Sequence, residues 1–254
     1  MGRGDRLTLD TACLGLAVRL ELTPSPTLWS MGAMNWSGVR QRVEALAHAD
    51  KSRKVFGAWD RYGGVGHHFR LADPLSESGV AEAEAQWGVS LPAAYRAFLL
   101  EVGAGGAGPG YGLTVLSRSD AGAGWLWSDV GGGTVHERLR IAFPGGEESV
   151  RVQDEHESRE PVESDFEDEG AFHEAYRAWL HEDEELFDWF SSGAVCLSHE
   201  GCGCCHWLVV SGSQRGQVWL DDRPADGRFR PLGEVAFADW YIGWVERSEA
   251  VVRR

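Results

Sequence analysis

The stretch CCHWLVV at residues 204–210 constrains the fold more than any other part of this chain. Read as a strand, its side chains alternate between two faces. One face carries Cys202, Cys204, His206, Leu208 and Val210, and the other carries Cys205, Trp207 and Val209. A strand with apolar side chains on both faces needs a sheet that is covered on both sides. The sequence therefore predicts a strand that is buried on both sides.

The same run contains residue types that bind metals. Cys196, His199, Cys202 and Cys205 follow one another at three-residue steps. Zinc sites commonly use two close pairs of ligands separated by a longer loop, and this run lacks that spacer. Cysteine is also among the most buried residue types and packs as a small apolar side chain. We therefore expect a strand and turn with no bound metal and no cofactor. A zinc-binding protein that uses the Cys/His run at 196–206 is the alternative.

Apolar periodicity elsewhere predicts helices before and after the sheet. The expected helices lie at 34–49, within 77–103 as a pair divided at Gly88, at 172–190 and at 237–248. Short extended pieces are expected in 111–116, 124–132 and 135–143, and three strands in 194–222, with tight turns at 200–201 and 212–216. This order indicates an α+β fold with a mainly antiparallel sheet.

The start of the chain differs from the rest. Residues 1–33 contain Pro24 and Pro26 and no apolar period, whereas a helical pattern follows Met34 closely. We interpret residues 1–33 as an extension outside the core fold, Met34 as the natural start, and residues 34–254 as one domain. No apolar run approaches the ~20 residues of a membrane helix, and the best signal-peptide candidate contains Asp10 and Arg19. We expect a cytoplasmic protein without a membrane partner.

Acidic residues are concentrated in one segment. Seventeen Asp and Glu residues and three Arg lie between Glu147 and Asp188, in a chain whose net charge is −15. One interpretation is a solvated acidic loop, an insert at about 147–170. The other is a surface that attracts a basic protein, because a concentrated field steers association. Direct binding of nucleic acid is not expected, since no basic stripe is present to neutralise phosphates.

Signatures of catalysis are weak. Gly103, Gly105 and Gly108 form a GxGxxG motif, but the motif follows a predicted helix rather than a strand. It therefore does not predict a pyrophosphate site, and we interpret it as a glycine loop. The sequence contains no Walker lysine, no HExxH and no GxSxG. We expect a protein that is not an enzyme.

Two distant stretches together resemble one known family. Glu84, Trp87 and Gly88 precede LPAAYRAFLLEVGAGGAGPGYGL, and VCLSHEGCGCCHWLVVSGSQRGQVWLDD precedes the aromatic stretch FADWYIGWVERS. Their order and spacing resemble the SMI1/KNR4 (SUKH) family over about residues 77–247. The resemblance implies a central sheet flanked by helices, without catalytic residues or cofactor. It also implies structural roles for Leu91, Pro92, Tyr95, Gly201, Cys202 and Gly216.

In bacteria, the resemblance implies an immunity protein that binds and neutralises a toxin. We expect the partner to be a cognate toxin domain, a basic nuclease being one case, and the alternative is a regulatory scaffold for protein interactions. The expected partner-binding residues are those of the acidic segment, Asp154, Glu155, Glu157, Asp165, Glu167 and Asp168. The glycine loop around Tyr111 and the exposed face of the sheet are the competing candidate surfaces.

Overall fold

The computed structural model describes residues 35–60, 65–119, 122, 124–128, 134–225 and 227–254. The expectations for residues 1–33 and for Met34 lie outside this part of the chain. The described residues form the helices α1 (Val39–Leu46), α2 (Glu77–Trp87), α3 (Ala93–Glu101), α4 (Gly146–Glu157), α5 (Glu169–Phe190) and α6 (Phe237–Arg253). Their strands are β1 (Leu116–Arg118), β2 (Trp125–Trp127), β3 (Ala194–Gly201), β4 (Cys204–Val209), β5 (Gln217–Asp221) and β6 (Phe229–Ala236).

The central sheet has four antiparallel strands in the order β3-β4-β5-β6, so that each strand pairs with its neighbour in sequence. β1 and β2 form a separate antiparallel pair. The turn between β3 and β4 lies at Cys202 and Gly203, which both have positive φ (52° and 85°). Two successive positive φ angles are typical of the tightest hairpins. The turn expected at 200–201 is therefore displaced along the chain, because Gly201 still belongs to β3.

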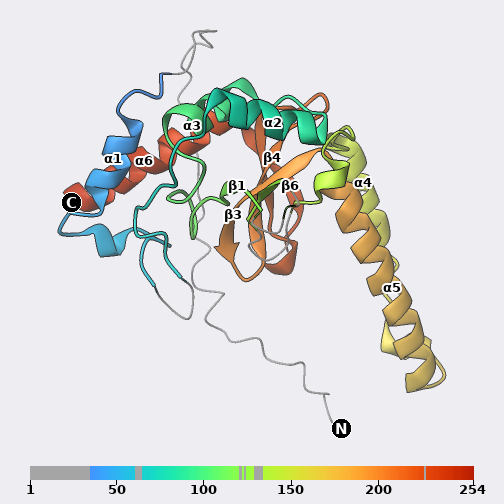
Figure 1. Ribbon diagram of the computed structural model, residues 1–254. Helices are drawn as coiled ribbons and strands as arrows, with labels where there is room; N and C mark the ends of the chain where they lie inside the picture. Colours follow the sequence, from blue (N-terminus) through green and yellow to red (C-terminus); the bar gives the residue numbers. More distant parts are fainter. Residues whose placement is uncertain (1–34, 61–64, 120–121, 123, 129–133, 226) are drawn as a thin grey trace. The chain divides into compact units, whose positions relative to one another are not determined.

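Each face of the sheet lies in its own apolar core. Leu208 and Val210 pack into a large core that includes residues of α1, α2, α3 and α6. Cys205, Trp207 and Val209 pack into a second core with the C-terminal end of α5. The two-sided alternation predicted for β4 is confirmed, as is the α+β class with a mainly antiparallel sheet flanked by helices (Figure 1).

Local signals account for the helices near the sheet. Gly88 ends α2 with φ 66°, a left-handed conformation that favours glycine, so the predicted division between two helices is confirmed. On α3, Tyr95, Phe98 and Leu99 are at most 2% exposed. The buried Tyr95 hydroxyl accepts a hydrogen bond from Trp127 Nε1 at 2.8 Å, which connects α3 to β2.

Three expectations are wrong in detail. The acidic insert at 147–170 is not a loop, because α4 and a 3-10 helix at Glu163–Asp165 occupy most of it. Residues 136–138 also form a 3-10 helix, although an extended piece was expected there. The expected strand at 111–116 begins only at Leu116, with Leu113 forming isolated bridges to Gly106 and Ser198. β6 was not predicted.

Candidate functional site

The acidic segment folds as two adjacent helices, α4 and α5, joined by residues 158–168 (Figure 1). We refer to residues 146–190 as the acidic hairpin. Asp168 begins α5, where its side chain accepts a hydrogen bond from the backbone N–H of Ala171 at 2.9 Å. Among the described residues of α5, only Phe190 is buried. The helix has 22 residues and is therefore about 33 Å long. Because only its last residue is buried, most of its length is in contact with solvent.

A glutamine anchors the hairpin to the sheet. Gln153 of α4 is 3% exposed and bonds both backbone groups of Phe229 on the edge strand β6. Its Nε2 donates to Phe229 O at 3.1 Å, and its Oε1 accepts from Phe229 N at 3.0 Å. The backbone groups of this edge residue are thereby paired, which anchors α4 beside β6.

The two helices of the hairpin meet at a histidine. His156 is 4% exposed, and its ring stacks on Trp179 of α5 with centroids 4.6 Å apart and planes 3° apart. Trp179 Nε1 donates to His156 O at 3.1 Å. The carboxylates of Glu182 and Asp183 lie 3.8 and 3.5 Å from the two ring nitrogens. A stacked aromatic pair, one partly buried hydrogen bond and two half-exposed carboxylates, rather than a broad apolar seam, hold the helices together here.

The carboxylates expected to bind a partner have different environments. Asp154 and Glu157 both form ion pairs with Arg228, the latter at 3.2 Å, and Glu155 approaches Arg151 at 3.4 Å. Asp168 caps α5. Asp165 and Glu167 lie exposed in the connection between the helices. The EDEE run at residues 182–185 was absent from the expected set, although its charge is evident in the sequence, and Glu184 and Glu185 are exposed on α5.

Tyr111 lies on a different part of the molecule from these carboxylates. Its backbone N–H donates to His199 O at 2.8 Å, which places it beside the end of β3. The glycine loop that precedes Tyr111 is mostly buried and packs against backbone, since a Cβ built on Gly105 would lie 2.2 Å from Thr114 O. The sequence was interpreted as a flexible glycine loop here, whereas these close backbone contacts make the loop a packing element.

The Cys/His run does not form a ligand cluster. Cys196 and Cys205 lie in the second core, His199 lies beside Tyr111, and Cys202 is exposed in the turn. Within the part of the chain that the structure describes, no three His, Cys, Asp or Glu side chains are grouped so that they could hold a metal ion. Burial and the nearby Asp222 carboxylate raise the pKa of Cys204 to about 11, so this thiol is protonated at neutral pH.

A Ser-His-Glu group lies within this run, at Ser198, Glu200 and His206, but does not have the geometry of a nucleophilic relay. Ser198 Oγ and Glu200 Oε1 both approach the same ring nitrogen, Nδ1 of His206, at 3.2 and 2.9 Å. In a relay the hydroxyl and the carboxylate contact opposite nitrogens of the imidazole. Ser198 is also 0% exposed. The group connects β3 to β4 and offers no accessible nucleophile.

The model of the SMI1 / KNR4 family (SUKH-1) matches residues 74–232, which include β1 to β5, the start of β6 and the acidic hairpin. This chain belongs to the SMI1/KNR4 family. The resemblance drawn from the sequence is confirmed, although the match stops within β6 and does not include α6. No curated protein and no solved structure matches the chain.

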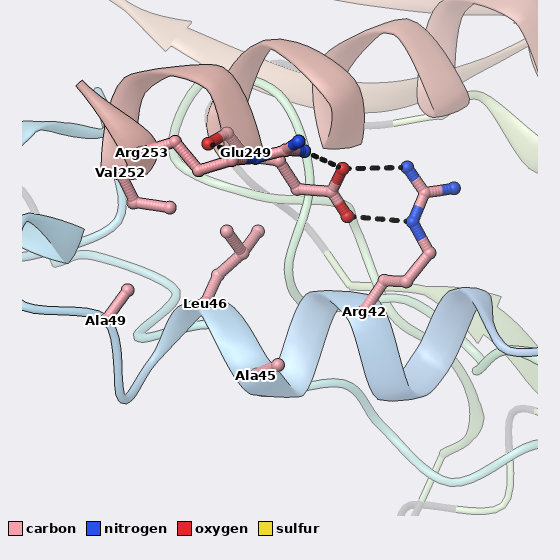
Figure 2. A pocket seen from close by; sticks show the side chains of 7 residues that line it. All are labelled: Arg42, Ala45, Leu46, Ala49, Glu249, Val252 and Arg253. Carbon is pink, nitrogen blue, oxygen red and sulfur yellow. Dashed lines mark hydrogen bonds and ion pairs between the residues drawn. The ribbon is translucent and has the colours of Figure 1, made fainter.

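The α1 and α6 helices of this SMI1/KNR4 chain lie outside the matched residues and form a shallow groove between them (Figure 2). The groove measures about 300 Å³ and has an apolar floor that includes Leu46 and Val252. Glu249 accepts two hydrogen bonds from Arg42, at 2.8 and 3.1 Å, and one from Arg253 at 2.8 Å. The Arg42 guanidinium holds the pKa of Glu249 below its usual range. The charged side chains thus pair with one another and join the two helices.

None of the described helices is both long enough and apolar enough to span a bilayer. The concentration of exposed carboxylates makes the acidic hairpin the strongest candidate site of this family member, and its chemistry is that of a charged binding surface. Family membership also favours a binding role, because SMI1/KNR4 domains are generally non-enzymatic and have an immunity-type role at the family level.

Proposed function

We propose that this chain is a non-enzymatic immunity protein that binds and neutralises a cognate protein toxin, and that the acidic hairpin attracts this partner. The observation that carries the proposal is the concentration of charge on one structural element. Seventeen acidic residues and three Arg lie between Glu147 and Asp188, and the segment is ordered as helices α4 and α5. An ordered field of one sign speeds association with a partner of opposite charge.

A basic toxin domain fits this surface. A nuclease binds phosphates through Lys and Arg side chains, and carboxylates arranged on a helical surface offer the same charge to those side chains. The exposed Asp165 and Glu167 and the run at 182–185 are the groups best placed to act, since Asp154 and Glu157 already pair with Arg228. We place the protein and its partner in the cytoplasm.

The test measures binding to the protein encoded by the adjacent reading frame. A variant with Asp165, Glu167 and Glu184 each replaced by Lys is compared with Glu234→Lys, which reverses an exposed charge on β6 outside the hairpin. The triple variant is expected to slow association about tenfold or more at low salt, with a smaller effect at high salt. The control is expected to change the rate less than twofold, a bound that follows from screening of a single exposed charge.

Two results bear directly against the proposal. If the adjacent protein does not bind, the immunity function is wrong for that pair. If it binds with the same rate and salt dependence in the triple variant, the acidic hairpin is not the attracting surface. Growth of cells that produce the partner provides the functional readout, because only a neutralising complex restores growth.

A further inference from the structure

Three aromatic rings contact one another in sequence near the end of β3, away from the acidic hairpin. Phe56 is 47% exposed, and its ring centroid is 5.6 Å from that of Tyr111. The Tyr111 centroid is in turn 6.1 Å from that of the partly exposed His199. We refer to Phe56, Tyr111 and His199 as the aromatic platform. Its members come from three segments that are far apart in sequence.

Backbone contacts between glycines fix the position of these segments. A Cβ built on Gly57 would lie 1.7 Å from Gly110 O, so only glycine permits this approach. A Cβ built on Gly110 would lie 2.4 Å from both His199 O and Glu200 Oε1. With little backbone freedom left to lose, the platform can bind a partner at a low cost in conformational entropy.

The chemistry of the platform favours a cationic side chain. The faces of Tyr and Phe rings attract guanidinium and ammonium groups. The Glu200 carboxylate lies next to Gly110 and is 25% exposed, with His206 Nδ1 at 2.9 Å. A partner drawn to a chain of net charge −15 is rich in Lys and Arg. Aromatic residues held rigidly at a surface are also the residues that most often dominate binding energy.

We propose that the aromatic platform is the surface that holds the bound toxin, by taking an Arg or Lys side chain of the toxin against Tyr111 and Phe56. This inference rests on the proposed function. The two surfaces then have different roles. The acidic hairpin determines the association rate, and the aromatic platform determines the dissociation rate. Most affinity differences within one interface lie in the dissociation rate, so the platform carries the specificity for the partner.

The first test is kinetic and uses the protein of the adjacent reading frame. Tyr111→Ala is expected to raise the dissociation rate about 30-fold, as for a hot-spot aromatic residue, and to leave the association rate within about twofold. Tyr111→Phe keeps the ring and is expected to retain most of the affinity. Ile141→Ala truncates another exposed apolar side chain, 45% exposed, and is the matched control. An unchanged dissociation rate in a folded Tyr111→Ala variant would overturn the inference.

A second test remains decisive if that protein does not bind and the immunity function fails. A capped tetra-arginine peptide is titrated into the isotope-labelled chain at about 150 mM salt, where attraction between exposed charges is largely screened. The amides of Gly110, Tyr111 and Gly203 are expected to shift, and their shifts are expected to disappear in Tyr111→Ala. Amide shifts confined to the acidic hairpin would contradict the proposed role of the platform. They would mean that the charge of the hairpin alone determines peptide binding.

Discussion

The acidic hairpin and the aromatic platform show two different ways in which one chain presents a surface. The hairpin consists of two regular helices that meet at a stacked His156–Trp179 pair. The amide of Gln153 and the apolar C-terminal end of α5 anchor it to the sheet. The platform has almost no regular structure and is held by backbone packed directly against backbone at Gly57 and Gly110. A hairpin of this kind tolerates surface changes, whereas the platform does not tolerate an added methyl group.

The largest expected effect is the loss of stability caused by replacing Gly57 beside the platform. Gly57→Ala puts a methyl group against Gly110 O and strains a backbone with φ 69°. We expect a loss of about 3 kcal/mol or more in the free energy of unfolding, because both segments must move apart. Gly38→Ala is the matched control, since Gly38 has φ 75° but nothing within 4 Å of its added Cβ. The expected cost of Gly38→Ala is about 1 kcal/mol, and urea denaturation measures both variants. Equal losses of unfolding free energy in the two variants would contradict the close-packing explanation.

The free energy of unfolding is expected to depend on pH through His67, whose backbone N–H donates to Gly57 O, next to the platform, at 3.2 Å. Burial, with a smaller contribution from His68, lowers the pKa of His67 to about 4. The unfolded chain therefore binds more protons than the folded chain between about pH 4 and 6.5, so this stabilisation is complete above pH 6.5 and is lost as pH falls toward 4. The expected loss is up to about 3 kcal/mol.

Denaturation curves at several pH values, for the native chain and His67→Gln, measure this effect. The variant is expected to have a flatter dependence of unfolding free energy on pH over that range. A variant with the same slope as the native chain would show that other groups cause the pH dependence.

Gln153, which anchors the hairpin, and Gln86, elsewhere in the chain, make the same kind of backbone contact. Gln86 bonds both backbone groups of Trp125, at 2.8 and 2.7 Å, just as Gln153 bonds those of Phe229, but Gln86 is exposed. Gln153→Leu leaves two buried backbone groups unpaired, with an expected cost of about 2 kcal/mol. Gln86→Leu is expected to cost about 1 kcal/mol or less, because water can replace the amide. Thermal unfolding of both variants gives the comparison, and a larger cost for Gln86→Leu would refute it.

The smallest expected effect concerns the cap of α5. Asp168→Ala removes the acceptor for the Ala171 N–H and is expected to cost about 1 kcal/mol, confined to the first turns of the helix. Asp168→Asn keeps a capping side chain and removes the charge. Amide exchange in residues 169–175 is expected to rise in the first variant and to change little in the second. Equal exchange in both would mean that charge, not the cap, stabilises this end.

The sequence predicts the parts of the fold that depend on regular periods. Alternation at Cys205, Trp207 and Val209 places β4 between two layers, and Gly88 marks a helix end, because each has a local physical cause. The hairpin helix α4 was missed because its buried stripe is polar and consists of Ser149, Gln153 and His156. A polar stripe of this kind resembles a solvated loop until the neighbouring strand and helix are placed.

The candidate site was predictable in composition but not in arrangement. Charge counts locate the acidic surface, yet they do not show that Arg228, more than 70 residues away in the chain, neutralises part of it at Asp154 and Glu157. Tyr111 was named from the sequence, but its neighbours Phe56 and His199 were not assigned to the same surface. Their proximity depends on long-range glycine contacts at Gly57 and Gly110, which leave no periodic signal.

The most direct test of the central claim is a hydrogen-exchange footprint of the chain with and without the protein of the adjacent reading frame. The two-surface account predicts strong protection on binding in segments 55–58, 109–112 and 199–204, which carry the platform, and weaker, salt-sensitive protection in the acidic hairpin at 146–190. Protection restricted to the hairpin, or to neither surface, would contradict the account.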